Sequence, residues 1–305
     1  MVSNENTNTY DLETSQALIR EVTMIKSVGL INGHYQCRSF NDSIPILTDL
    51  LALEIVTEKD KEMILKHPNT DWRFVVHEAG ADAPDKLRLN HYGVRVATNS
   101  EIDEAAEYLR AKKKQYRIKV DKIQHKHLAR SVHFFEPGGN WWEIESYEDA
   151  VKQGLGANVS VPWERPLLPD KFPGRGYVPQ ALTHGTIGCS SLEASRKFYK
   201  EVLGLDVVSP VPNVPPRYIK HPSTPWYIVS LEVPTENRIP QLPSQRFTIA
   251  VESVSAVGEA HDWIERSRDR LGVTELGDIN ESDGTISFLL GDPDRNWWEI
   301  TSPVN

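Results

Sequence analysis

The sequence predicts an α+β fold in which four βαβββ modules, two in each of two tandem domains, form two cup-shaped mixed sheets. Three observations support this prediction: the chain length, an internal repeat, and a proline-rich stretch between the two copies of the repeat. A chain of 305 residues is about twice as long as a typical single domain. We therefore divide it into an N-terminal extension (1–27), a first domain (28–150), a linker (151–180) and a second domain (181–305).

The repeat is visible in three pairs of segments that have similar patterns at a nearly constant offset. These pairs are 140–144 with 296–300, 50–56 with 202–208, and 91–98 with 246–253. The first pair reads Asn-Trp-Trp-Glu-Ile in both copies. Three matches in the same order indicate a tandem duplication.

The segments outside the repeat have compositions of their own. Apolar residues between Leu18 and Ile25 have the spacing of one short amphipathic helix. The linker contains five prolines between Val159 and Pro179. Because proline fixes φ and removes a backbone donor, we expect a semi-rigid connection here and no strand.

Within each copy, short β-rich runs alternate with helical patterns in the same order. In the first copy we predict strands at 34–38, 73–77, 89–96, 131–135 and 142–146, and helices at 42–51 and 101–112. In the second copy we predict strands at 182–189, 226–232, 246–251, 285–290 and 298–301, and helices at 192–203 and 254–271. Each copy therefore contains two βαβββ modules, with a helix after the first strand of each.

The composition predicts a cytoplasmic protein that binds neither nucleic acid nor membrane. Lys and Arg number 34 against 43 Asp and Glu, which gives a formal net charge of −9 and argues against a nucleic-acid backbone as partner. No window approaches about 18 uninterrupted apolar residues, and the polar, acidic start of the chain is unlike a signal peptide. Only Cys37 and Cys189 are present, which favours a reducing compartment.

Two polar residues of the first copy are candidate metal ligands at the inner face of a cup. His91 begins one predicted strand and Glu143 lies in the closing strand, and imidazole and carboxylate groups are common metal ligands. The second copy has Arg246 and Glu299 at the equivalent positions. Arginine is always charged and has no lone pair to give, so we predict a metal site only with residues of the first-copy pair.

Two segments resemble a known superfamily. Residues 182–205 resemble the opening strand and helix of the vicinal oxygen chelate superfamily, which includes glyoxalases, bleomycin resistance proteins and extradiol dioxygenases. Residues 123–143 are similar to type I extradiol ring-cleavage dioxygenases, because His125 is followed by an apolar residue, a Glu-Pro-x-Gly motif and Glu143. The departure is His133, where that pattern has tyrosine. The resemblance covers the whole chain outside the extension and the linker.

The resemblance implies a metal site of two histidines and one carboxylate, which would hold Fe(II) or, alternatively, Mn(II). His91 and Glu143 match two of the three ligands. The third ligand is either His184, which has the family position in the second copy, or His34, which lies two residues beyond the matching Asn32 in the first copy. If the ligand is His184, both copies contribute to one site.

The resemblance also implies catalytic roles for two further histidines. His125 matches the acid–base group that moves protons near bound oxygen, a task that suits an imidazole. His133 would replace the expected tyrosine in hydrogen bonding or proton transfer to a substrate hydroxyl. Their second-copy counterparts are Glu281 and Leu289, which confines both roles to the first copy. No residue is assigned to an organic cofactor, and O₂ is the implied co-substrate.

The implied function is that of an extradiol-type dioxygenase of aromatic degradation, which cleaves a small catechol- or hydroquinone-like diol with O₂. Two alternatives stay open: another metal-dependent enzyme of the superfamily (an isomerase, lyase or hydrolase), and a non-enzymatic ligand-sequestering protein of the bleomycin-resistance type. An uncovered strand edge is compatible with a homodimer.

Overall fold

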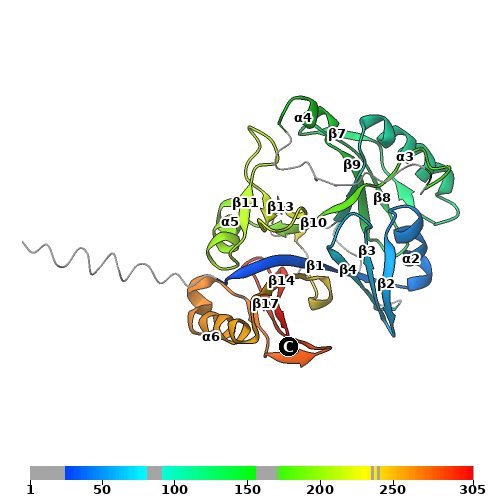
Figure 1. The fold of residues 1–305 in the computed structure, drawn as a ribbon. Coiled ribbons are helices and arrows are strands. Elements are labelled where there is room, and N and C mark those ends of the chain that lie inside the picture. The colour runs from blue at the N-terminus through cyan, green and yellow to red at the C-terminus, as the bar shows by residue number, and fades with distance from the viewer. Residues whose placement is uncertain are drawn as a thin grey trace, which may run out of the picture.

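A computed structural model shows two nine-stranded mixed sheets with helices on their outer faces (Figure 1). It describes residues 25–80, 91–155, 170, 172–234, 237–238 and 241–304. The helix predicted from Leu18 lies outside these residues, as does most of the N-terminal extension and part of the linker. No helix in the described ranges is long and apolar enough to span a membrane.

Four modules follow one another along the chain, as the sequence predicts: the first and third are βαβββ, and the second and fourth contain one further short strand. The first contains β1 (Ser27–Cys37), α2 (Phe40–Asp49), β2 (Glu54–Lys59), β3 (Glu62–Lys66) and β4 (Arg73–Glu78). The second contains β5 (His91–Arg95), α3 (Asn99–Lys112), β6 (Lys119–Val120), β7 (Gln124–Lys126), β8 (Ala129–Phe135) and β9 (Trp141–Ser146), and is followed by α4 (Glu148–Lys152). The third contains β10 (Ala181–Cys189), α5 (Leu192–Glu201), β11 (Asp206–Val208), β12 (Tyr218–Lys220) and β13 (Tyr227–Glu232). The fourth contains β14 (Phe247–Val251), α6 (Val254–Leu271), β15 (Glu275–Leu276), β16 (Asn280–Ser282), β17 (Thr285–Gly291) and β18 (Trp297–Pro303), and is preceded by the short helix η3 (Pro243–Gln245).

Each sheet combines one module from each sequence copy. The first–fourth sheet has the order β15-β17-β18-β14-β1-β4-β3-β2, and the second–third sheet has the order β11-β12-β13-β10-β5-β9-β8-β6. The ninth strand of each lies off this path, with β16 paired to β17 and β7 paired to β8. In Figure 1 the blue strand β1 accordingly lies beside β14 from the far end of the chain. The two repeats of the sequence are therefore not the two structural cups: each cup is assembled from one half of each repeat.

The helices begin at the same kind of residue in every module. A serine or threonine after the first strand accepts a hydrogen bond from a backbone N–H of the first helical turn, as N-cap side chains do. These caps are Ser39, Thr98, Ser191 and Ser253. In α3 the buried residues Ile102, Ala105, Ala106 and Leu109 have helical spacing and face β8 and β9. The predicted helix positions are correct, with starts up to two residues late.

Aromatic side chains join the two sheets in a common core. Trp72 and Trp226 are buried and stack with ring centroids 3.6 Å apart and an interplanar angle of 9°. Each indole precedes the last strand of its module, β4 or β13. Tyr92 of one sheet and Phe247 of the other pack against each other beside this pair. Large aromatic groups from both sheets therefore pack together at this junction and bury apolar area there.

The end of the linker is fixed to the first copy. The hydroxyl of the buried Tyr177 donates to Leu50 O at 2.9 Å, and Gln180 N donates to Arg95 O at 2.6 Å. His67 is fully buried, with Nε2 3.0 Å from Pro179 O and Nδ1 accepting from Asn69 N at 3.1 Å. One ring nitrogen therefore donates and the other accepts, which is the pattern of a neutral imidazole. Burial lowers the pKa of His67 to about 4, although the bond to Pro179 acts in the opposite direction.

We predict that stability decreases below neutral pH partly because of His67. Its pKa falls from 6.5 in the unfolded chain to about 4 in the folded one, so the unfolded chain takes up a proton first as the pH falls. The free energy of unfolding is therefore unaffected above pH 6.5 and decreases as the pH falls from there through 4. The change amounts to about 3 kcal/mol. Urea unfolding at pH 7 and pH 4 measures how much free energy of unfolding is lost between the two pH values. A His67→Gln variant should lose less than wild type, by about that amount. Equal losses in variant and wild type would contradict the prediction.

Candidate metal centre

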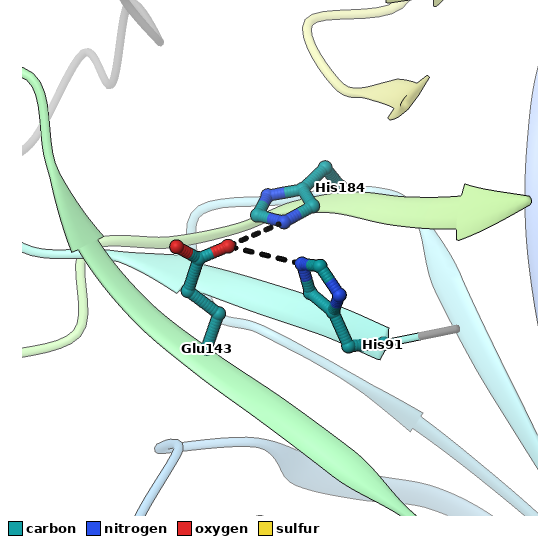
Figure 2. Close-up of side chains that lie close together, drawn as sticks. All are labelled: His91, Glu143 and His184. Carbon is teal, nitrogen blue, oxygen red and sulfur yellow. Dashed lines mark hydrogen bonds and ion pairs between the residues drawn. The ribbon is translucent and has the colours of Figure 1, made fainter. Parts of the chain in front are cut away.

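Three potential metal ligands meet inside the second–third sheet (Figure 2). Nε2 of His91 lies 3.0 Å from Oε2 of Glu143, and Nε2 of His184 lies 3.2 Å from the same oxygen. The three donor atoms all lie within 4.8 Å of one another. Both histidines are buried and Glu143 is nearly so. Two metal–ligand bonds of about 2.1 Å at right angles separate their donor atoms by about 3 Å. The distances from Oε2 of Glu143 to the two imidazole nitrogens therefore fit ligands of one ion.

Strand pairing around Gly93 brings these side chains together. Gly93 of β5 pairs in parallel with Glu143 of β9 and in antiparallel with His184 of β10. A Cβ atom at Gly93 would lie 2.1 Å from Cε1 of His184. The imidazole of His184 therefore lies directly over this backbone position, and glycine is the residue that leaves room for it.

The structure places His184, and not His34, beside His91 and Glu143. His34 lies in the first–fourth sheet, where Nδ1 is 3.0 Å from Nε2 of His77 and Nε2 is 3.0 Å from Oγ1 of Thr248. There Asn32 pairs with Thr248 as His184 pairs with Gly93. In the first copy, asparagine therefore occupies the position that matches His184. The side chain of His34 contacts His77 and Thr248 instead, in the first–fourth sheet.

Arg246 occupies the place of His91 in the first–fourth sheet. Its Nε donates to Oε2 of Glu299 at 3.0 Å, so the carboxylate that corresponds to Glu143 is neutralised by an internal guanidinium.

Only one of the two predicted catalytic histidines faces the cluster. Nε2 of His133 lies 3.2 Å from Oε1 of Glu143, and the buried imidazole stacks on Trp141 at 4.8 Å between ring centroids. His125 instead has a side chain that is 55% exposed and pairs with Asp149 at 3.1 Å. Its neighbours Gln124 and Lys126 line the cavity, so His125 points to the other face of β7, because side chains alternate along a strand. This placement corrects the prediction that His125 faces the metal ligands.

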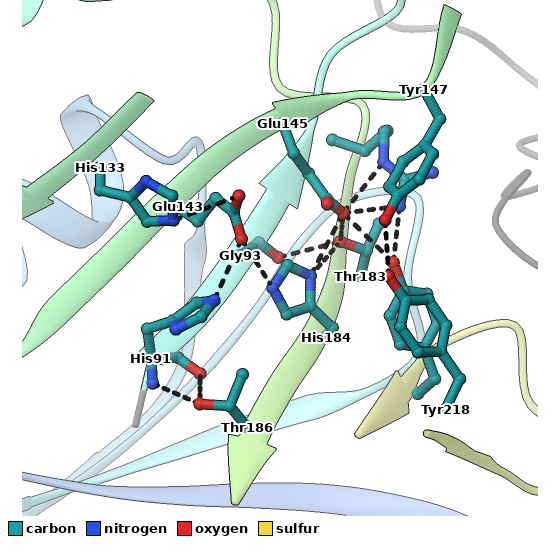
Figure 3. Close-up of polar contacts among 12 residues, drawn as sticks. His91, Gly93, His133, Glu143, Glu145, Tyr147, Thr183, His184, Thr186 and Tyr218 are labelled. Atoms are coloured by element: carbon teal, nitrogen blue, oxygen red, sulfur yellow. Dashed lines mark hydrogen bonds and ion pairs between the residues drawn. The ribbon is translucent and has the colours of Figure 1, made fainter. Parts of the chain in front are cut away.

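Glu145 is a site residue that the sequence analysis missed (Figure 3). Its Oε1 lies 3.2 Å from Nδ1 of His184, the nitrogen on the far side of the ring from Glu143. Thr183 Oγ1 and Arg95 Nη2 donate to the same oxygen at 3.1 and 2.6 Å. A carboxylate at the second nitrogen fixes the orientation and tautomer of a ligating histidine. The available signal was spacing, because residues i and i+2 of a strand share a face and Glu145 follows Glu143 by two.

The buried charges of this network compensate one another. Burial would raise the pKa of Glu145, but Arg95 and His184 lower it to about 2. Burial would likewise raise the pKa of Glu143, but His133 and the other two imidazoles hold it well below its usual range. Both carboxylates are therefore ionised at neutral pH.

The two candidate histidine ligands have opposite pKa shifts. Burial lowers the pKa of His91 to about 4, which leaves a neutral ring with a lone pair for a cation. Burial would also lower the pKa of His184, but Glu145 and Glu143 raise it to about 9. His184 touches two carboxylates and His91 only one, which explains the difference.

A cavity of about 300 Å³ opens beside these residues. Its lining includes Glu143, His184 and His133 together with aromatic and aliphatic side chains from the second and third modules. Its volume is at the lower end of the usual range for small-molecule sites, which suits a ligand of about one ring.

Comparisons with known proteins agree with this architecture. A family model described as Glyoxalase/Bleomycin resistance protein/Dioxygenase superfamily matches residues 33–144 and 181–300. A proposed dioxygenase from Bacillus subtilis subsp. subtilis str. 168 shares 10% identity over 92% of this chain and 86% of its own, with a TM-score of 0.58. A single-site variant of glyoxalase I from Zea mays shares 15% identity over 94% of this chain and 96% of its own, with a TM-score of 0.60. These likenesses show the fold alone, and the curated proteins contain no significant match.

We predict that Arg95→Met lowers the free energy of unfolding by about 3–5 kcal/mol, because it leaves the buried Glu145 carboxylate without its main counter-charge. The double variant Arg95→Met/Glu145→Gln should lose less than the single one, since it removes the uncompensated charge as well. Urea unfolding at pH 7 measures both. Equal losses in the two variants would show that Arg95 acts through packing and not through Glu145.

Proposed function

This chain belongs to the Glyoxalase/Bleomycin resistance protein/Dioxygenase superfamily, and from this premise we propose that it is a metal-dependent extradiol-type dioxygenase. Its substrate is a small catechol- or hydroquinone-like diol, and O₂ is the co-substrate. His91, Glu143 and His184 hold Fe(II), with Mn(II) as the alternative ion. When bound, the metal supplies coordination positions for two substrate oxygens and for O₂.

The second and third modules pair their first strands in antiparallel, so each position in one module has a counterpart in the other. The single observation that carries this proposal is that the counterpart of the carboxylate Glu143 is not a metal-binding residue. In the module of His91, Gly93 lies two residues further along the strand and pairs with Glu143. In the module of His184, Thr186 lies two residues further along and pairs with Val229. Val229 is thus the counterpart of Glu143, and it lines the same cavity with an aliphatic side chain. Three protein ligands leave more of the metal available to reactants than four would, which favours chemistry with a chelating diol and a second small molecule.

The chain's own residues supply positioning and proton handling around this centre. Glu145 directs Nε2 of His184 into the site by binding Nδ1. Thr186 bonds both backbone groups of His91, accepting from N at 2.6 Å and donating to O at 3.1 Å, which fixes where that strand begins. Trp141 and Val229 provide apolar walls against which an aromatic ring can pack.

His133 is the residue we assign to the substrate hydroxyl. It lines the cavity beside Glu143, and its Nδ1 is buried with no hydrogen-bond partner among the residues that the structure describes. An imidazole held in this way can accept or donate a proton at an oxygen placed next to the metal ligands.

The function is tested by metal loading followed by O₂ uptake with a panel of catechols and hydroquinones. Wild-type protein loaded with Fe(II) or Mn(II) should consume O₂ in proportion to diol. His184→Ala removes a ligand and should lower metal affinity by more than about 100-fold, because even the loss of an outer hydrogen-bond partner costs 10–100-fold. His34→Ala is the matched control from the other sheet and should keep both metal and uptake. Absence of uptake with every diol and either metal rejects the dioxygenase.

We predict that His133→Gln lowers kcat by about 10²–10⁴-fold, the usual contribution of a proton-transferring side chain. Metal bound from an excess of Fe(II) should stay within about twofold of wild type, because loss of His133 weakens the hold on Glu143 without removing one of the proposed ligands. Rapid-mixing kinetics and metal analysis on the same samples separate the two effects. A variant that loses metal and activity together would assign His133 to the ligand set instead.

A further inference from the structure

Arg217 places a positive charge in the cavity, and no acid among the described residues forms an ion pair with it. It immediately precedes β12, and its backbone is fixed at both ends, since N donates to Val208 O at 3.0 Å and O accepts from Ser230 N at 2.8 Å. Its side chain lines the cavity that contains Glu143 and His184. Nε is buried without a hydrogen-bond partner, and no ion pair of Arg217 exists within the described part of the chain.

The acids of the cavity are already engaged with other groups. Among the described lining residues, Glu143 and Glu145 are the two carboxylates. Glu145 pairs with Arg95 and His184 at 2.6 and 3.2 Å, and Glu143 lies against three imidazoles. Neither can also neutralise Arg217. A buried donor without a partner costs free energy that a suitable ligand would recover.

A second cation strengthens the positive field. Lys126 lines the same cavity from β7 of the second module, whereas Arg217 comes from the third. Lys126 and Arg217 thus come from different modules of the same cup. The remaining walls are mostly apolar and aromatic, including Tyr147, Tyr218 and Val214. The combination suits a single aromatic ring that carries a negative charge.

We propose that the substrate is an aromatic diol with a carboxylate substituent, and that Arg217 binds this carboxylate while the two hydroxyl groups face the metal ligands. A guanidinium presents two parallel N–H groups that match the two oxygens of a carboxylate, which gives orientation as well as affinity. Lys126 adds charge at longer range. The proposal deepens, and rests on, the proposed dioxygenase function.

The test compares acids with their neutral esters. Protocatechuate, homoprotocatechuate and gentisate are each assayed against the methyl ester on Fe(II)-loaded protein. At least one acid should have a KM about 10- to 100-fold below that of its ester, as expected for charge-assisted bonds. Arg217→Met should remove this preference by raising KM for the acid, and should leave KM for the ester within about twofold. Arg217→Lys keeps the positive charge but not the planar pair of N–H groups, so it should retain part of the preference for the acid.

Arg266→Met is the matched control, because it removes one exposed arginine from α6, a helix of the fourth module outside the second–third sheet. It should leave the acid preference unchanged. The inference is overturned if no acid is preferred over its ester, or if Arg217→Met weakens acids and esters equally. The second result would mean that Arg217 only supports the fold.

Calorimetry with an inert acid separates this inference from the function on which it rests. Phenylacetate and its methyl ester have no hydroxyl groups to react, so their binding reports the anion site alone. Binding of phenylacetate that Arg217→Met weakens, without O₂ uptake on any diol, would reject the dioxygenase and keep the carboxylate site. Uptake of O₂ with diols, but binding of phenylacetate that does not depend on Arg217, would keep the dioxygenase and reject the carboxylate site.

Discussion

The antiparallel pairing of β5 with β10 is the interaction on which the candidate site depends. It joins the second module to the third across the boundary between the sequence copies, and it sets His184 opposite Gly93. The parallel pairing of β5 with β9 sets Glu143 on the other side of the same glycine. A shift by one residue in either register would turn a ligand to the opposite face of the sheet. The missing Cβ of Gly93 then lets the imidazole of His184 lie close over the strand.

The first–fourth sheet shows the same geometry with different chemistry. Asn32, Thr248 and Arg246 stand where His184, Gly93 and His91 stand in the second–third sheet. The side chain of Thr248 uses the space that glycine leaves, and its hydroxyl bonds Glu299 at 2.8 Å. Arg246 supplies from within the chain the positive charge that a metal would bring to the corresponding carboxylate. One cup thus carries its own counter-ion, whereas the other groups two imidazoles and a carboxylate that could hold a metal ion.

The sequence predicted local features better than the long-range arrangement. The fold class, the four modules and nearly all element positions follow from local patterns and from the repeat, because capping residues and strand alternation act over a few neighbours. His91 and Glu143 were identifiable because the second copy offers Arg246 and Glu299 for comparison. The choice between His184 and His34 could not be made, because it depends on which modules share a sheet. His125 was assigned by resemblance alone, and a motif match does not show which face of β7 a side chain takes: its neighbours Gln124 and Lys126 line the cavity instead.

The residues that local patterns could not reveal are those that act through partners from other strands. Glu145 belongs to β9, Arg95 to β5 and Thr183 to β10, and their side chains meet only because these three strands are adjacent. The same three strands carry Glu143, His91 and His184. The buried charge network and the candidate ligands therefore share one framework, and Glu145 is the residue that belongs to both, because it contacts Arg95 and Nδ1 of His184. A buried ion pair often adds little net stability compared with apolar groups of similar size, and here the same carboxylate that pairs with Arg95 also holds Nδ1 of the candidate ligand His184.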